Sequence, residues 1–237
     1  MKILALESSA KSVSVAVCEN SVILAQGYQN TGLTHSVTMM PLLENMLEKA
    51  SLSLQEMDII AVAAGPGSFT GLRIGVSAAK GLAWTLDKPC CGVSTLEAMA
   101  ENGRSFEGTV ICAMDARRQQ IYNAIFECRN GVLHRRCEDR AVALAQVAED
   151  LRHDPAPKLV LGDGAQLCCD YLTAQGIACR MAPPHLRYQQ AAGVALVAEV
   201  MAQSGNTVSA QALQPTYLRL SQAERERLEK GLPLTVE

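Results

Sequence analysis

Hydrophobic and polar positions follow the same order in two parts of the chain. An apolar run at residues 3–6 ends in Glu7, and a second run at residues 111–114 ends in Asp115. Each run is followed by a polar turn and by a segment in which apolar residues alternate with others, the pattern of a strand with one buried face. The two copies keep a constant offset. The sequence therefore predicts a duplicated unit in which an acidic residue ends the first strand.

The elements that follow keep the same order in both halves. Each half is expected to continue with a strand, a helix, a strand, a glycine turn, a helix, a strand and a helix. In the first half we expect them at 22–28, 36–50, 59–64, 70–86, 90–93 and 95–102, and in the second at 132–138, 141–151, 159–161, 166–175, 177–181 and 189–203. Tight turns make the first three strands antiparallel, and strands reached through helices should be parallel.

This order predicts an α/β protein made of two β-β-β-α-β-α-β-α lobes with mixed sheets. We expect an N-terminal lobe at residues 1–104, a reduced C-terminal lobe at 105–204 and a tail at 205–237. The duplication resembles the actin-like superfamily of actin, hexokinase and Hsp70 (the ASKHA fold). That resemblance implies a cleft between the lobes in which active members hold a nucleotide. A generic α/β protein with two similar sheets is the alternative.

A glycine-rich loop at residues 65–75 joins a predicted strand to a predicted helix. Ser68 or Thr70 can cap that helix, whose free N–H groups could face an anion. The spacing is not that of a P-loop, since no Lys-Ser/Thr pair closes it. The candidate anion or nucleotide residues are the loop positions and one arginine of the second polar turn: Gly65, Gly67, Ser68, Thr70, Gly71 and Arg117.

Two helices of the first half carry more apolar surface than one sheet contact needs. In the helix at 70–86, small residues recur every four positions, although interior glycines cost about 1 kcal/mol each relative to alanine. The helix at 36–50 is rich in methionine, which suits adaptable contacts. We expect a partner interface at Met39, Met40, Leu43, Met46, Leu47, Gly71, Ile74, Gly75, Ala78 and Ala79. The alternative is that both helices only cover their own sheet.

Composition and missing motifs narrow the function. The 237 residues are 49% hydrophobic and carry a net charge of −3, so a broad basic face for binding a polyanion is not expected. The four histidines lie far apart in sequence, which argues against a local zinc motif. The polar turns after Glu7 and Asp115 contain no glycine to wrap phosphates. We expect no metal site and no catalytic residues. The absence of a signal peptide and of a membrane span predicts a cytoplasmic protein.

Several segments resemble one family. They are residues 3–7, the loop at 65–75, residues 92–96, the Asp-Ala-Arg segment at 115–117 with residues 121–122, and residues 215–219. Together they span nearly the whole chain and are similar to the TsaB family, also called YeaZ. The glycine loop is shared with the paralogous TsaD enzymes, whereas the combination with the two later segments is typical of TsaB.

The resemblance implies a non-catalytic subunit with no cofactor of its own. Family members pair with TsaD through the two first-lobe helices and act with the ATPase TsaE. The complex transfers threonylcarbamoyl to the transfer RNA adenosine next to the anticodon. It also implies that ATP or ADP binding belongs to the complex and that transfer RNA is contacted mainly through it. A homodimer of the isolated chain stays open. The alternatives are a free-standing actin-like ATPase or kinase and, with little support, a metalloprotease.

Overall fold

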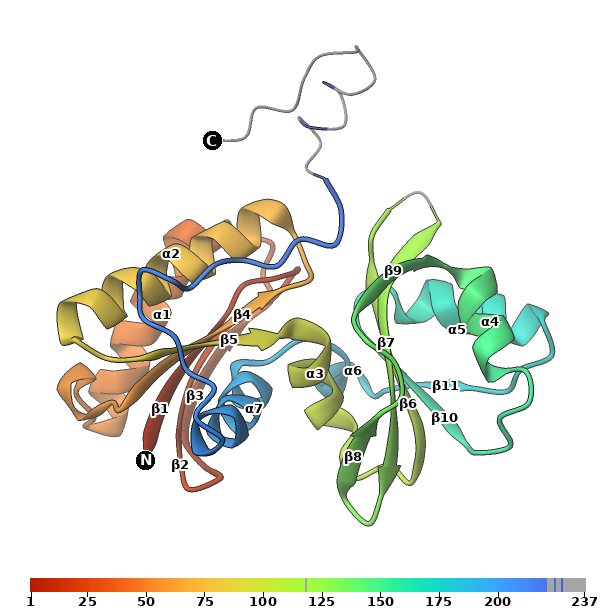
Figure 1. Cartoon of the computed structure of the whole chain (residues 1–237), viewed down its shortest axis with the longest axis horizontal. Coiled ribbons are helices and arrows are strands. Elements are labelled where there is room, and N and C mark those ends of the chain that lie inside the picture. The colour runs from red at the N-terminus through yellow and green to blue at the C-terminus, as the bar shows by residue number, and fades with distance from the viewer. Residues whose placement is uncertain (118, 221–223, 225–226, 228–237) are drawn as a thin grey trace.

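The protein is described by a computed structural model that covers residues 1–117, 119–220, 224 and 227. It has two lobes, each built on a mixed sheet (Figure 1). The sequence does not reveal whether residues 221–237 are ordered, and positions 221–223, 225–226 and 228–237 lie outside the described part. None of the described helices is long and apolar enough to cross a membrane.

The first sheet has the order β3-β2-β1-β4-β5. Its strands are β1 (Lys2–Glu7), β2 (Val13–Glu19), β3 (Val22–Gln29), β4 (Ile59–Gly65) and β5 (Cys90–Ser94). β1, β2 and β3 pair antiparallel, and β4 and β5 join in parallel. The helices of the first half are α1 (His35–Ala50), α2 (Phe69–Leu86) and α3 (Thr95–Ala100), with short 3-10 turns η1 (Leu54–Glu56) and η2 (Glu101–Gly103).

The second sheet repeats this order as β8-β7-β6-β10-β11, with β9 added against β7. Its strands are β6 (Gly108–Asp115), β7 (Gln120–Arg129), β8 (Val132–Arg135), β9 (Arg140–Ala143), β10 (Lys158–Leu161) and β11 (Arg180–Met181). The helices are α4 (Leu144–Leu151), α5 (Ala165–Ala174), α6 (Pro184–Arg187) and α7 (Ala191–Gln203). Because strand order and strand direction both repeat, the predicted actin-like duplication is confirmed.

The central strands of each sheet are buried on both faces. On the first sheet, one face packs against α1 and α2 and the other against α7 (Figure 1). The second sheet packs against α3 on one face and against α4 and α5 on the other. Strands with two covered faces need apolar residues at nearly every position, which accounts for the unbroken apolar runs in β1, β4 and β6.

The last helix of each half packs on the sheet of the other half, although α3 also contacts its own sheet through Ala98. α3 follows the first sheet in sequence, yet its Leu96 and Met99 belong to the core of the second sheet. α7 lies in the range expected for the second lobe, yet Val194 and Ala198 belong to the core of the first sheet. The two helices cross closely, since a Cβ at Gly193 would overlap the carbonyl oxygen of Ala98. A division at residue 104 therefore follows the chain but not the two cores.

Some predicted boundaries in the second half were wrong. The strand expected at 132–138 ends at Arg135, and the helix expected from 141 begins at Leu144 because residues 140–143 form β9. The strand expected at 177–181 is only Arg180–Met181. The short helix α6 was not predicted; a proline at its first position starts it.

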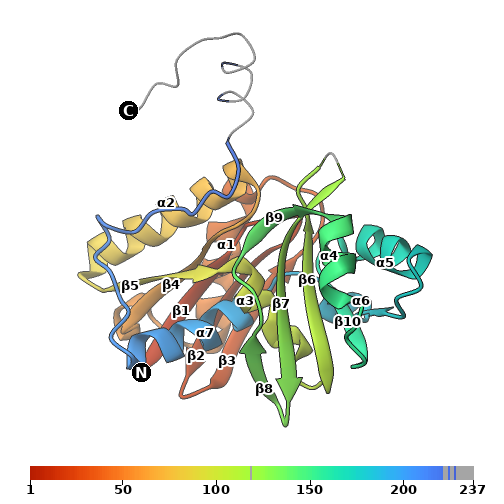
Figure 2. The ribbon, with the colours of Figure 1, turned by 45° about the vertical axis from the view of Figure 1, so that its right-hand side comes forward.

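The described part of the tail packs on the first lobe and reaches the second. Val208 forms a β-bridge with Cys90 at the start of β5, and Leu213 is buried in the core under α2. The segment then runs alongside α2, as Figures 1 and 2 both show. The Thr216 N–H donates to the Ala64 carbonyl at 2.7 Å, and Arg219 donates to the Ala116 carbonyl of the second lobe.

Candidate functional site

The described structure is hollowed at two neighbouring places that share Phe69 and Thr70 at the start of α2. One is a cleft between the lobes, lined by the turn after β1, the start of α2, the turn after β6, Asp163 and the segment 216–220. The other is a groove between α1 and α2. The resemblance to the actin-like fold predicted a cleft between the lobes, and the apolar faces of the two helices predicted a partner interface in the region of the groove.

The start of α2 is held against the turn after β1. Ser68 is the N-cap, and its hydroxyl accepts from the Gly71 N–H at 3.3 Å. The Ser68 N–H in turn donates to the Ser9 carbonyl at 2.6 Å. The hydroxyl of Ser8 donates to the Gly71 carbonyl at 2.8 Å. These bonds fix the first turn of α2 directly above the acid-bearing turn of the first strand.

The glycines of the loop make room for the chain itself. A Cβ at Gly65 would overlap the Thr216 carbonyl oxygen, and one at Gly71 would overlap the Ser8 carbonyl oxygen. A Cβ at Gly67 would lie 2.5 Å from the Ser9 carbonyl oxygen. Gly65 and Gly71 do not line the cleft, contrary to the candidate anion loop. Their lack of a side chain serves close packing between segments.

The remaining candidates of that loop do meet in the cleft. Gly67, Ser68 and Thr70 line one wall, and Arg117 reaches it from the turn after β6. Arg117 has φ 63°, and its N–H donates to the Asp115 carboxylate at 2.7 Å. The structure therefore brings together the two polar turns that the duplication predicted to be equivalent.

Sequence reasoning missed several cleft residues. Lys11, Asp163, Tyr217 and Arg219 also line it. The duplication gave a usable signal for two of them, because Lys11 lies in the turn that corresponds to Arg117, and Asp163 lies in the glycine turn that corresponds to the loop at 65–75. Nothing local in the sequence indicated that the tail would return to this wall.

Two carboxyl groups near the cleft, one buried and one half-buried, have raised pKa values. Burial raises the pKa of Glu7 from 4.5 to about 7, although the Ser9 hydroxyl and the Ser9 N–H, 2.5 Å from Oε1, favour its charged form. Burial also raises the pKa of Asp163, while the Asp115 N–H and Lys11 oppose that shift. Glu7 is fully buried among the serines of its turn, so it has no open path to a ligand.

An aromatic and cationic cluster links the cleft to the groove. Phe69 and Tyr217 stack with their ring centroids 4.6 Å apart. The Arg73 guanidinium lies 4.1 Å from the Phe69 centroid, and its Nε donates to the Tyr217 hydroxyl at 3.2 Å. Lys80 on the same helix donates to the carbonyls of Gln211 and Leu213, which fixes the tail along α2.

Only part of the expected partner surface lies at the groove. Met39, Met40, Ile74 and Ala78 line it, together with His35, Ser36, Phe69, Thr70, Arg73 and Ser77. His35 Nε2 is 2.6 Å from the Ala10 carbonyl oxygen, so it ties α1 to the turn after β1. Trp84 is 72% exposed, and helical periodicity places it on the same face of α2 as Arg73 and Ser77.

The rest of the expected surface is inside the chain, which corrects that expectation. Leu43, Met46 and Leu47 pack in the core beneath α1, and Ala79 packs there beneath α2. Gly71 and Gly75 face the turn after β1, where a Cβ on Gly75 would lie 2.5 Å from Ser8 Oγ and 3.2 Å from Val62. The small residues let α2 approach its own sheet, so these six positions are not open to a partner in this conformation.

The chemistry available at these sites is binding chemistry. In the described part of the chain, no three His, Cys, Asp or Glu side chains are gathered so that they could hold a metal ion. The cleft offers cations, two carboxylates and stacked rings, which suit a polar ligand. The groove offers thioether and aliphatic side chains with an exposed tryptophan beside it, which suits a helix or another apolar protein surface.

Comparison with known proteins gives consistent relatives. A family model described as TsaD, tRNA N6-adenosine threonylcarbamoyltransferase, matches residues 29–226. The chain is 34% identical over 233 residues to the tRNA threonylcarbamoyladenosine biosynthesis protein TsaB of Bacillus subtilis, covering 97% of this chain and 99% of that one. The corresponding Escherichia coli protein is 30% identical, with 92% and 95% covered.

A solved structure agrees with these relatives. YeaZ from Pseudomonas aeruginosa superposes with a TM-score of 0.78 at 26% identity, covering 92% of this chain and 99% of that one. The duplicated fold agrees with that of the solved relative, and the named relatives match this chain over nearly their whole length. The chain therefore belongs to the TsaB (YeaZ) family.

Proposed function

We propose that this chain is a non-catalytic accessory subunit in the biosynthesis of threonylcarbamoyladenosine on transfer RNA. Its full-length relatives are named for that pathway. In this proposal the chain pairs with a TsaD homologue and acts together with a TsaE homologue in the cytoplasm. ATP or ADP is bound by the complex, and this chain supplies no reacting group and no cofactor.

The observation that carries the pairing is the groove between α1 and α2. Both helices already cover the first sheet, and yet Met40, Ile74 and Ala78 remain partly exposed on their outer side. Trp84 extends this surface along α2, and exposed tryptophans commonly anchor protein interfaces. A groove between two helices can accept a helix of a partner by ridge-into-groove packing. In the absence of the partner, the same groove can serve a homodimer.

The groove and the cleft are mechanically connected. Phe69 and Thr70 belong to both, and Arg73 contacts the groove and Tyr217 at once. A partner that packs in the groove therefore also contacts the start of α2, and through Arg73 it can affect the tail segment at Tyr217 that crosses to the second lobe. Such a subunit can favour one conformation of its partner, which requires preferential binding to that conformation.

Reconstitution tests the proposal. The chain is combined with the TsaD and TsaE homologues of the same organism, transfer RNA and the threonylcarbamoyl donor, and the modified nucleoside is measured. We expect a stable complex with TsaD in size-exclusion chromatography and loss of modification when this chain is omitted.

Two results would contradict the proposal. Full modification without the chain would remove the accessory role. ATP turnover by the purified chain at about 1–10 per second, lost in Asp115→Ala, would favour the free-standing ATPase instead.

A further inference from the structure

Three cationic side chains from distant segments meet at the cleft between the lobes. Lys11 comes from the turn after β1, Arg117 from the turn after β6 and Arg219 from the tail segment. Lys11 and Arg117 are exposed, and Arg219 is half-buried. Arg219 is held in place by its bond to the Ala116 carbonyl, next to Arg117 in sequence. Their meeting depends on the duplication and on the return of the tail.

Within the described part of the chain, the two carboxylates of the cleft form no ion pair with these cations. Asp115 accepts from the Arg117 N–H at 2.7 Å, and Asp163 accepts from the Asp115 N–H at 3.1 Å. Lys11 is near enough to Asp163 to affect its pKa. Among the described residues, however, neither Lys11 nor Arg117 nor Arg219 forms an ion pair. Charged side chains at an exposed mouth without a partner are available to an anion.

Stacking surface lies beside the cations. Tyr217 is 38% exposed, and its ring stacks on that of Phe69. The Arg73 guanidinium lies over the Phe69 ring. Arg73 adds a further positive charge whose contacts are an aromatic ring and a phenol oxygen, not a carboxylate. Cations beside an exposed aromatic ring are a usual combination for binding single-stranded nucleic acid, because phosphates meet the cations and an unpaired base can stack on the ring.

The cleft is poorly built for wrapping a free nucleotide. The turn after β1 presents Ser9 and Ala10 where glycines would let backbone amides approach phosphates closely, and the space at Gly65 and Gly71 is filled by the chain itself. Two of the cations that line it, Lys11 and Arg117, are exposed and can be reached from outside. An external phosphate ester fits this arrangement better than a buried one.

We propose that Lys11, Arg117 and Arg219 at the mouth of the cleft bind backbone phosphates of transfer RNA, with Tyr217 beside them. This inference rests on the proposed function, since it assigns this chain a direct contact with the RNA substrate of the complex. The overall charge of −3 limits the contact to a local patch that adds to the affinity of the partner.

The test measures binding of labelled transfer RNA to the complex with the TsaD homologue at several salt concentrations. The double variant Lys11→Gln/Arg117→Gln should raise Kd about tenfold, if removing each surface charge weakens binding roughly threefold. The slope of log K against log salt should become shallower by about 0.7–0.9 for each phosphate that the variant no longer neutralises. Arg117→Lys should retain most of the affinity, because it keeps the charge.

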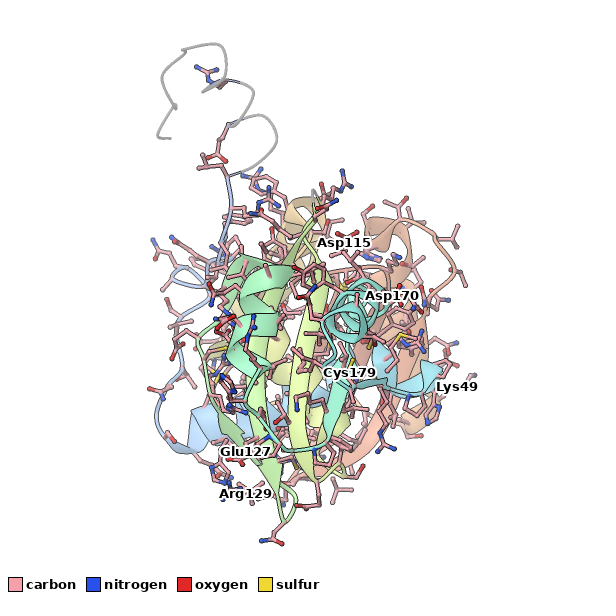
Figure 3. All side chains as sticks on the ribbon, turned by 90° about the vertical axis from the view of Figure 1, so that its right-hand side faces the viewer. Lys49, Asp115, Glu127, Arg129, Asp170 and Cys179 are labelled. Carbon is pink, nitrogen blue, oxygen red and sulfur yellow. The ribbon has the colours of Figure 1, made fainter. Side chains whose placement is uncertain are left out.

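Arg129→Gln is the matched control. Arg129 ends β7, whereas Arg117 lies just before the start of that strand, and Figure 3 shows Arg129 at the end of the lobe away from Asp115. The control removes one arginine charge outside the cleft and should leave both Kd and salt slope unchanged. An equal loss for each charge removed, in the control and in the cleft variant, would show that only overall charge matters and would overturn the proposal.

A parallel titration with ATP separates the two sources of phosphate. Binding of ATP by the complex that weakens in the cleft variants while transfer RNA binding does not would assign the site to a free nucleotide and overturn the RNA contact. If the wild-type chain fails to pair with TsaD, the proposed function fails. If pairing is normal and the cleft variants bind transfer RNA like the wild type, only this inference fails.

Discussion

Glu7 ends the first strand with a carboxyl group that is fully buried. Because burial raises its pKa from 4.5 to about 7, the folded state binds a proton more tightly than the unfolded state in that range. The contribution of Glu7 to stability is therefore intact below about pH 4.5 and is lost as the pH rises to about 7. The shift corresponds to about 3 kcal/mol at most.

Replacing Glu7 with glutamine should remove this dependence. We expect Glu7→Gln to be as stable as the wild type at pH 4.5 and more stable by up to about 3 kcal/mol at pH 8. Urea unfolding at several pH values measures the difference between the two proteins, which cancels the titration of all other groups. A difference that stays constant from pH 4.5 to 8 would contradict the raised pKa.

Gly71 and Gly81 lie in the same helix and have opposite surroundings. A Cβ at Gly71 would overlap the Ser8 carbonyl oxygen, whereas nothing lies within 4 Å of a Cβ at Gly81. We expect Gly71→Ala to lower the unfolding free energy by about 1–3 kcal/mol, because the overlap exceeds the gain in helix propensity. Gly81→Ala should raise it by up to about 1 kcal/mol. Thermal unfolding of both variants measures this, and equal effects would refute the close packing at Gly71.

The stripe of small residues shows what sequence could and could not predict at this scale. Its period of four located a close contact on one face of α2. It could not tell whether that contact was with a partner or within the chain, because both require the absence of side chains. The deciding group is Ser8, which lies 63 positions away in sequence and bonds to Gly71.

At the scale of elements, α2 has two faces with different tasks. Gly71, Gly75 and Ala79 face the chain's own core, and Ile74 and Ala78 face the groove. Helical periodicity from the sequence found both sets, and only the fold separated them. The same helix can therefore be altered on one face to test folding and on the other to test pairing.

Ala78→Arg should block pairing with the TsaD homologue without unfolding the chain. The new side chain would fill the groove and place a charge among Met40 and Ile74, and its stem can still reach solvent. We expect the binding free energy to weaken by about 1.4 kcal/mol or more, which corresponds to at least a tenfold loss of affinity.

Ala145→Arg on α4 is the matched control, because Ala145 is exposed on the second lobe. Calorimetric titration with TsaD and thermal unfolding should show weakened binding for Ala78→Arg alone and little change in melting for both. Normal binding of Ala78→Arg would exclude the groove as the docking surface.

Short elements were the least predictable. β9 has four residues and takes its strand conformation from β7, so the sequence predicted a helix there instead. β11 was expected at 177–181, but only its two residues that pair with β10 form a strand. The longer strands and helices of the first half were predicted within a few residues. Each of these elements is long enough for its apolar positions to repeat with the period of a strand or a helix.

At the scale of the molecule, each half lends its last helix to the other. The chain order predicted the duplicated fold correctly, but it placed α7 with the lobe that precedes it in sequence. No local pattern contains this information, because an apolar helix such as α7 can cover either sheet. The two helices cross closely at Gly193 and Ala98.

A fragment of residues 1–104 should therefore not fold alone. It lacks α7, so Ile3, Ala5 and Ala61 on one face of its sheet would be open to water. Fusing residues 185–220 to it through a flexible linker should restore a cooperative transition, because α7 and the tail segment would then be present. Circular dichroism and amide hydrogen exchange compare the two proteins. A cooperative transition in the short fragment would show that the first lobe needs no contribution from the second half.

The late position of α7 in the sequence also sets the order in which the parts of the protein can fold during synthesis. A ribosome makes the first sheet early, but the helix that covers one of its faces is encoded after residue 190. At about 5–20 residues per second, the stretch from residue 105 to 203 takes on the order of 5–20 seconds to synthesise. During that interval the second lobe can assemble while the first carries a bare apolar face. The nascent chain is thus a natural client for chaperones until its last helix emerges, and the part of the protein made first is completed last.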